Sequence, residues 1–151
     1  MAMPGRGFIQ RFLARAVHEG ATHAVVELTS EGARQSRHRF LFLDGLVVTN
    51  IHPEHIESHG SFENYVAAKR EVVRELERSP KRPRILVANT DAKETADFLN
   101  AQVEEKLGFG VRELTGAPVT TLPGDFNRMN ALAVYKLCRA LGVSDADIQA
   151  G

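Results

Sequence analysis

Three short runs rich in β-branched residues constrain the fold of this chain more than any other feature. They are HAVVEL (23–28), GLVVTN (45–50) and RILVAN (84–89), and residues that favour turns bound each of them. Apolar runs of this length are typical of strands buried on both faces, as in a parallel sheet covered by helices. Because helical patterns alternate with these runs, the sequence predicts βαβ units.

The helical patterns between and after these runs complete the prediction. Apolar residues from Phe8 to Val17 recur at the spacing of one helix face, and Gly20 follows as a stop. A second helix is expected from the N-cap Ser61 to the prolines of SPKRP (79–83). Further helices are expected over 92–108, from Asp125 to Leu141 and in SDADIQ (144–149), with β-like pieces at 108–114 and 117–122. We therefore predict one α/β domain over residues 1–151, a three-layer parallel sheet of the P-loop-like, Rossmann type with helices on both faces.

Composition narrows the class of partner and the compartment. Nineteen basic and nineteen acidic residues give a net charge of zero, so no long-range field favours nucleic acid or an anionic membrane. The single cysteine, Cys138, excludes an internal disulfide and suggests a reducing compartment. No apolar run reaches the length of a membrane span and the N-terminus has no signal pattern, so we expect a cytoplasmic protein.

The stretch HPEHIESHGSFENYVAAK (52–69) combines histidines and glutamates with a lysine on the apolar side of a helix. Lys69 completes the core-facing stripe of Phe62, Tyr65, Val72 and Leu76. One interpretation is that its aliphatic stem lies on the core while the charge reaches solvent. The other is that burial lowers the pKa of the amine, because a desolvated lysine releases its proton easily. A neutral amine near a cation can act as a nucleophile, or take up carbon dioxide and become an anionic metal ligand.

Ligands of open α/β sheets bind beyond the carboxyl ends of the strands, which locates the functional edge. Glu27 ends the first predicted strand, and the 52–59 loop follows directly after the second. Glu27, His55 and Lys69 are therefore expected to converge on a divalent cation, and an oxygen-rich set with one histidine suits magnesium or manganese better than zinc. A zinc hydrolase using His52, His55 and His59 is a third possibility, although neither H-E-x-x-H nor H-x-x-E-H occurs in this loop.

Four stretches in this order resemble a known family. They are VVELTSEGARQSR, VVTNIHPEHIESHGSFENYVAAK, ILVANTD and LPGDFNRMNALAVYKLCRALGV. Together they resemble the central domain of the Mur ligases, in the UDP-N-acetylmuramoyl-tripeptide synthetase branch. These enzymes use ATP to convert the carboxylate of a UDP-muramoyl peptide into an acyl phosphate, which the amine of an incoming amino acid attacks.

The resemblance implies roles by position. It assigns magnesium binding to Glu27, His55 and a carbamylated Lys69, and muramoyl-peptide binding to Thr29, Ser30, Gln35 and Arg37. It places Asn127 and Asn130 near the nucleotide, Asn130 on the adenine side. The implied cofactors are Mg²⁺ and ATP, and the implied substrates are a UDP-N-acetylmuramoyl peptide and an amino acid.

The sequence also departs from the family pattern. No G-x-x-G-K-[ST] phosphate loop occurs in it, and residues 106–124 are short for the small extra sheet of the family. We therefore expect a partial central domain without the UDP-binding and C-terminal ligase domains, with negligible ligase turnover alone. A non-catalytic ligand- or metal-binding module derived from that domain is the alternative. A homodimer or a partner chain is expected to cover the exposed sheet edge that this truncation implies.

Overall fold

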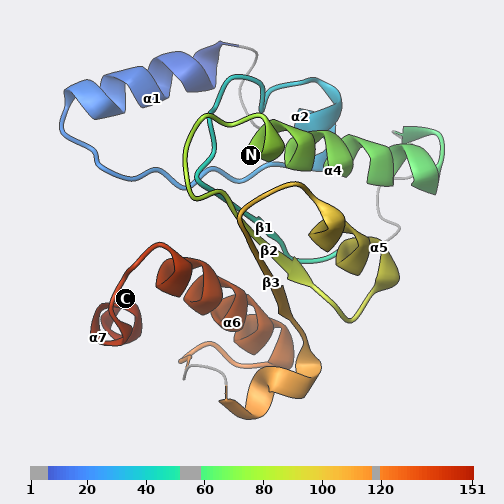
Figure 1. Cartoon of the computed structure of the whole chain (residues 1–151), viewed down its shortest axis with the longest axis vertical. Helices are drawn as coiled ribbons and strands as arrows, with labels where there is room; N and C mark the ends of the chain where they lie inside the picture. Colours follow the sequence, from blue (N-terminus) through green and yellow to red (C-terminus); the bar gives the residue numbers. More distant parts are fainter. Residues whose placement is uncertain (1–6, 52–58, 117–119) are drawn as a thin grey trace. The chain divides into compact units, whose positions relative to one another are not determined.

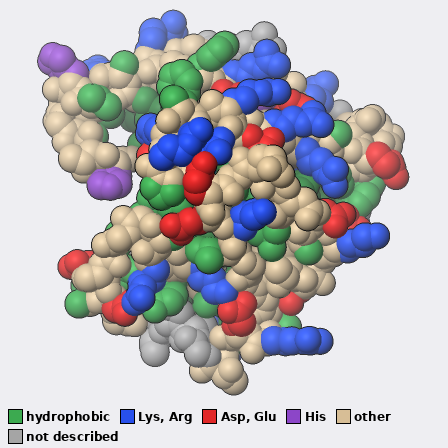
Figure 2. Space-filling view, in the orientation of Figure 1, with side chains coloured by type: hydrophobic (Ala, Val, Ile, Leu, Met, Phe, Trp, Pro, Cys, Tyr) green, Lys and Arg blue, Asp and Glu red, His purple; other side chains and the backbone are tan. Residues whose placement is uncertain are grey.

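A computed structural model describes residues 7–51, 59–116 and 120–151 of the chain. The chain folds into two compact parts. The first part comprises residues 1–42 and 53–75, and the second comprises residues 43–52 and 76–151. On the face drawn in Figure 2, Lys and Arg side chains are interspersed with Asp and Glu, in keeping with a net charge of zero.

The second part is built on a parallel sheet of three strands, as the sequence predicts. The strands are β1 (Gly45–Val48), β2 (Ile85–Asn89) and β3 (Glu105–Phe109), in the spatial order β1-β2-β3. Gly45 pairs with Ile85 and Ile85 pairs with Glu105, so the three strands begin level with one another. The predicted strands at 45–50 and 84–89 are thereby confirmed, and so is the α/β class.

Both faces of the central strand β2 are covered, which explains its unbroken apolar sequence. Ile85, Val87 and Phe109 pack against the long helix α6 (Asp125–Ala140) through Leu132 and Ala133. The alternate residues Leu86 and Ala88 are also fully buried, on the opposite face.

The short helix α5 (Lys93–Ala96) and the 3₁₀ turn η1 (Asp97–Asn100) follow β2 and contact it. Leu99 of η1 lies against the face of Gly108 that points away from α6. Figure 1 shows α6 along one side of the sheet and α5 on the other. The turn η2 (Val111–Gly116) and the terminal helix α7 (Asp145–Ala150) complete this part, with Ser144 as the N-cap of α7. The predicted last helix and its short successor are both confirmed.

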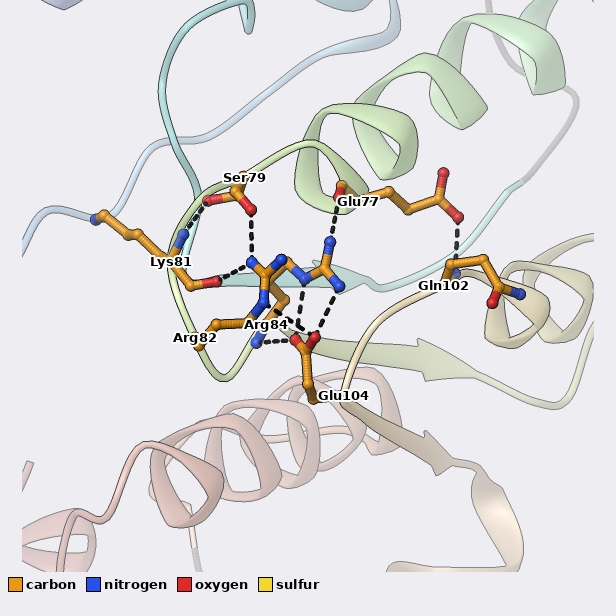
Figure 3. A network of polar contacts seen from close by, with 7 residues as sticks. All are labelled: Glu77, Ser79, Lys81, Arg82, Arg84, Gln102 and Glu104. Carbon is orange, nitrogen blue, oxygen red and sulfur yellow. Dashed lines mark hydrogen bonds and ion pairs between the residues drawn. The ribbon is translucent and has the colours of Figure 1, made fainter.

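A polar network joins the beginnings of β2 and β3 (Figure 3). The Arg84 guanidinium donates to both carboxylate oxygens of Glu104 at 2.9 and 2.7 Å and to the carbonyl of Glu77. The backbone N–H of Arg84 also donates to Glu104, at 2.8 Å. The Glu77 carboxylate accepts from the backbone N–H of Gln102 at 2.8 Å. These contacts fix the chain on entry to both strands.

The first part contains the helices α1 (Phe8–His18), α2 (Ser30–Arg34) and most of α4 (Phe62–Glu77). Gly20 takes a φ of 93°, which only glycine adopts readily, and it ends the α1 region as predicted. Ser61 caps α4, since its Oγ accepts from the backbone N–H of Asn64 at 3.2 Å. The apolar residues Phe8, Phe12 and Val17 of α1 are 48%, 62% and 70% exposed.

The predicted buried strand at 23–28 is wrong. Residues 21–29 form no regular secondary structure, and Val25 is fully exposed. Strand propensity chiefly reflects packing against neighbouring strands, and no strand among the described residues pairs with this segment. Glu27 consequently does not end a strand.

The helix predicted over 92–108 is wrong beyond Asn100. Residues 105–109 form β3 instead, because pairing with β2 outweighs the helical preference of the Glu and Lys residues there. The β-like piece predicted at 108–114 begins within β3, but its remainder is the 3₁₀ turn η2. The piece predicted at 117–122 lies partly outside the described residues, and residues 120–122 are not strand.

Candidate functional site

Lys69 is the predicted site residue whose environment is most unusual. It lies half-buried on α4, on the stripe where Tyr65 and Val72 are buried at 6% and 5% exposure. Burial lowers the pKa of the Lys69 amine below its ordinary value, and the Glu27 carboxylate acts against that shift. The side chain therefore does not project freely into solvent, and the structure favours the desolvated interpretation of Lys69.

The predicted metal set is described only in part. Glu27 lies on the exposed segment before α2, and its charge acts on Lys69. His55 lies outside the described residues, as does His52 of the zinc alternative. Among residues 7–51, 59–116 and 120–151, His, Cys, Asp and Glu side chains form no group of three that could hold a metal ion. A carboxylate beside a half-buried amine still fits magnesium, since Mg²⁺ takes oxygen ligands and a carboxylated amine would supply them.

One aromatic ring lies near the Lys69 amine, and two further rings contact that ring. The amino nitrogen of Lys69 lies 5.9 Å from the centroid of the Tyr65 ring, one helical turn earlier. The His59 ring meets Tyr65 edge-on at 5.4 Å, and the Phe62 ring stacks on Tyr65 at 6.1 Å. His59 is only 7% exposed, and its Nε2 has no hydrogen-bond partner within the described part of the chain.

The residues predicted to contact the muramoyl peptide lie on and around α2. The Thr29 hydroxyl accepts from the backbone N–H of Gly32 at 3.1 Å and so caps this helix, and Ser30 is buried at its first position. Gln35 follows the helix, and its side-chain oxygen accepts from the Arg37 guanidinium at 3.0 Å. The four residues thus occupy one short segment, and two of them are in contact.

Glu31 is a member of this cluster that sequence reasoning missed. Its carboxylate accepts from Arg34 at 2.7 and 2.9 Å and from the Gln35 amide. Hydrogen bonds from Arg34, followed by that from Gln35, lower the pKa of Glu31 to about 2. The spacing E-x-x-R-Q carries the signal, because residues three and four apart meet on a helix surface.

The two asparagines predicted near the nucleotide lie in the second part of the chain, at the start of α6. The Asn127 side chain donates to the carbonyl of Pro123 at 2.7 Å, so it helps to fix the helix N-terminus. Asn130 is exposed one turn later. Asn130 is therefore the more accessible of the two.

A carboxylate at the end of β2 also escaped the sequence analysis. Asp91 accepts from the backbone N–H of Val111 at 3.0 Å, and its own N–H donates to the Asn89 side chain at 2.8 Å. Gly110 lies so close that an added Cβ would stand 2.6 Å from the Asp91 carboxylate. Asp91 thus ties the end of β2 to the exit of β3, which is a structural role.

The fold defines a class: a Rossmann-like α/β protein with a parallel sheet and helices on both faces. The sequence profile described as Mur ligase middle domain matches residues 6–117. The chain belongs to the Mur ligase family, and the resemblance that the sequence suggests is confirmed.

Similar curated proteins agree on the branch of the family. A UDP-N-acetylmuramoyl-L-alanyl-D-glutamate–L-lysine ligase of Enterococcus faecalis is 28% identical over 95% of this chain and 33% of its own length. The corresponding protein of Streptococcus thermophilus is 32% identical over 93% of this chain and 32% of its own length. A UDP-N-acetylmuramoyl-L-alanyl-D-glutamate–2,6-diaminopimelate ligase of Chlamydia felis is 31% identical over 74% of this chain and 22% of its own length.

The chain spans about a third or less of the length of these curated relatives. Within the described residues, no helix combines the length and apolar character that crossing a membrane requires.

Proposed function

We propose that this chain is the central-domain portion of an ATP-dependent amide ligase that adds an amino acid to a UDP-N-acetylmuramoyl peptide. The family match over residues 6–117 and the synthetase relatives support this function. The observation that carries it is the half-buried Lys69, whose pKa burial lowers and on which the Glu27 charge acts. Such a lysine is unusual on a surface helix and is suited to carbamate formation.

The proposed chemistry at Lys69 begins with its neutral amine. The nitrogen lone pair attacks the carbon of carbon dioxide, an N–C bond forms, and the electron pair of one C=O π bond moves to its oxygen. One N–H proton then passes to solvent bicarbonate. The resulting carboxylate, Glu27 and His55 would then hold Mg²⁺. When bound, magnesium neutralises the negative oxygens that phosphoryl transfer to a carboxylate brings together.

The remaining site residues are proposed to bind and orient the substrates. Thr29, Ser30, Gln35 and Arg37 would hold the muramoyl peptide, with the Arg37 guanidinium facing its anionic groups. Asn127 and Asn130 would lie near the nucleotide. The activities named for the relatives point to lysine or 2,6-diaminopimelate as the added amino acid. A cytoplasmic location would suit the single free thiol of Cys138.

Manganese binding tests the proposed metal site, because Mn²⁺ replaces Mg²⁺ at oxygen-rich sites and is seen by electron paramagnetic resonance. In bicarbonate buffer, the wild-type chain is expected to bind Mn²⁺ about tenfold or more tightly than Lys69→Ala or Glu27→Gln. Lys81→Ala is the matched control, since Lys81 forms an exposed ion pair with Asp44 in the second part of the chain. Equal Mn²⁺ affinity in wild type and Lys69→Ala would refute the assignment.

A second function is a non-catalytic module that binds the UDP-muramoyl peptide, and the sequence of this chain favours it in one respect. The four residues predicted to bind the muramoyl peptide all lie within residues 29–37, so this part of the site is a single segment. This alternative predicts micromolar binding of UDP-muramoyl dipeptide by isothermal titration calorimetry without ATP. ATP-dependent ligation by the purified chain would overturn it.

A further inference from the structure

The amino group of Lys69 has a specific neighbour that the proposed metal chemistry leaves unexplained. The Tyr65 ring lies one turn before Lys69 on α4, with its centroid 5.9 Å from the Lys69 nitrogen. The ammonium form of a lysine over a tyrosine face is attracted by the ring quadrupole. Burial is the largest cause of the lowered Lys69 pKa.

The Tyr65 ring is itself fixed. Tyr65 is 6% exposed, the His59 ring meets it edge-on at an interplanar angle of 81°, and Phe62 stacks on it at 23°. His59 precedes α4, and its carbonyl accepts from the Asn64 side chain at 3.0 Å, which attaches the His59 backbone to the first turn of the helix. A ring held on two sides is a rigid surface, whereas a lysine side chain is among the most flexible in proteins.

The two residues before Lys69 offer its side chain little restraint. Ala67 is exposed and Ala68 is partly buried, and both are too small to confine a lysine side chain. By contrast, Lys81 and Lys136 are held by ion pairs with Asp44 and Glu113, both at 2.5 Å. Lys69 therefore combines the charge of Glu27 with a contact to the Tyr65 ring, whereas these other lysines form close ion pairs.

We propose that Tyr65 is a positioning residue for Lys69: its ring, fixed by His59 and Phe62, holds the Lys69 amino group on the buried side of α4. The importance of this amine placement for ligand binding rests on the proposed function of Lys69. The contact between Tyr65 and Lys69 does not depend on that function. The proposed contact with Lys69 is made by the Tyr65 ring, so phenylalanine should replace tyrosine in this role. A flexible aliphatic side chain of similar size should not.

The test uses the 151-residue chain labelled with ¹³C at lysine Cε. The chain has five lysines, so the ¹H–¹³C spectrum holds five Cε signals, and Lys69→Arg identifies the signal of Lys69. The ring current of Tyr65 should move the Lys69 Hε protons upfield of the other four lysines. Tyr65→Phe should keep that shift, and Tyr65→Leu should abolish it while far-ultraviolet circular dichroism stays unchanged. A wild-type Lys69 signal among the other four, or a shift that persists in folded Tyr65→Leu, would overturn the proposal.

A second experiment, which measures carbamate formation at Lys69, distinguishes the positioning role of Tyr65 from the proposed function. With ¹³C-bicarbonate, wild type and Tyr65→Phe should give a carbamate signal that Lys69→Arg lacks. Tyr65→Leu should reduce its occupancy about threefold or more, because an amine released from the buried side of α4 keeps its proton more often. An upfield Lys69 signal without any carbamate would support the positioning role and contradict the proposed metal chemistry. A carbamate of equal occupancy in folded Tyr65→Leu would contradict the positioning role alone.

Discussion

Arg84 shows how one side chain determines local structure in this protein. Its side chain is 12% exposed and bonds to Glu104 and to the carbonyl of Glu77, so it connects three segments. We expect Arg84→Met to lower the urea midpoint of unfolding, because the Glu77 carbonyl and the Glu104 carboxylate lose the Arg84 guanidinium together. Lys81→Met, which removes only an exposed ion pair, is the matched control and should change the midpoint far less. Equal effects of the two substitutions would contradict this role of Arg84.

The ion pair between Arg84 and Glu104 should also make the stability of the fold depend on pH. Hydrogen bonds from the Arg84 side chain, followed by that from its backbone N–H, lower the pKa of Glu104 from 4.5 to about 2. A carboxyl with a depressed folded-state pKa adds stability above its unfolded pKa and loses it as the pH falls toward the folded value. The difference in urea midpoint between wild type and Arg84→Met should therefore be constant above about pH 5 and shrink between pH 4.5 and 2. A difference that grows on acidification would refute the assignment.

At the scale of elements, β3 depends on its packing against α6. Phe109 is 1% exposed in the cluster formed with Leu132 and Ala133, so Phe109→Ala should cost about 3–5 kcal/mol of unfolding free energy. Val111, two residues later, is 55% exposed, and Val111→Ala should stay within about 0.5 kcal/mol. Urea denaturation of both variants measures the contrast. Losses of similar size would show that β3 does not pack as described.

The elements that sequence reasoning predicted correctly are those with strong local signals. The helix α4 has a serine N-cap and is followed by prolines that end it, and β2 is an unbroken apolar run. Both elements can therefore be predicted from their own residues, without knowledge of the elements that pack against them. EKLGF (105–109) has no such signal, because its Glu and Lys suit a helix and only pairing with β2 makes it a strand. Helical spacing alone predicts that Lys69 lies on the buried side of α4. The aromatic contacts near Lys69 could not be predicted in this way, because they involve His59, which lies outside α4.

At the scale of the whole molecule, regular hydrogen-bonded structure is distributed unevenly along the chain. The backbone of β2 pairs on both sides, whereas residues 21–29 form no regular structure and Val25 is fully exposed. Hydrogen–deuterium exchange should therefore be slowest at Leu86 to Ala88 and fast throughout 22–28. Slow exchange within 22–28 would indicate that HAVVEL pairs as a strand, as the sequence predicts. The apolar pattern could not show which neighbour this segment has, and that neighbour determines whether a strand forms.

The most direct test of the proposed function is a diffraction experiment on crystals of this chain grown with MnCl₂ and bicarbonate. Anomalous scattering locates manganese independently of any assumption about its ligands. We predict one strong anomalous peak bonded to the Glu27 carboxylate, the His55 imidazole and a carboxylated Lys69. An ordered Lys69 whose unmodified amine points into solvent, with no peak near Glu27, would contradict the proposed magnesium site.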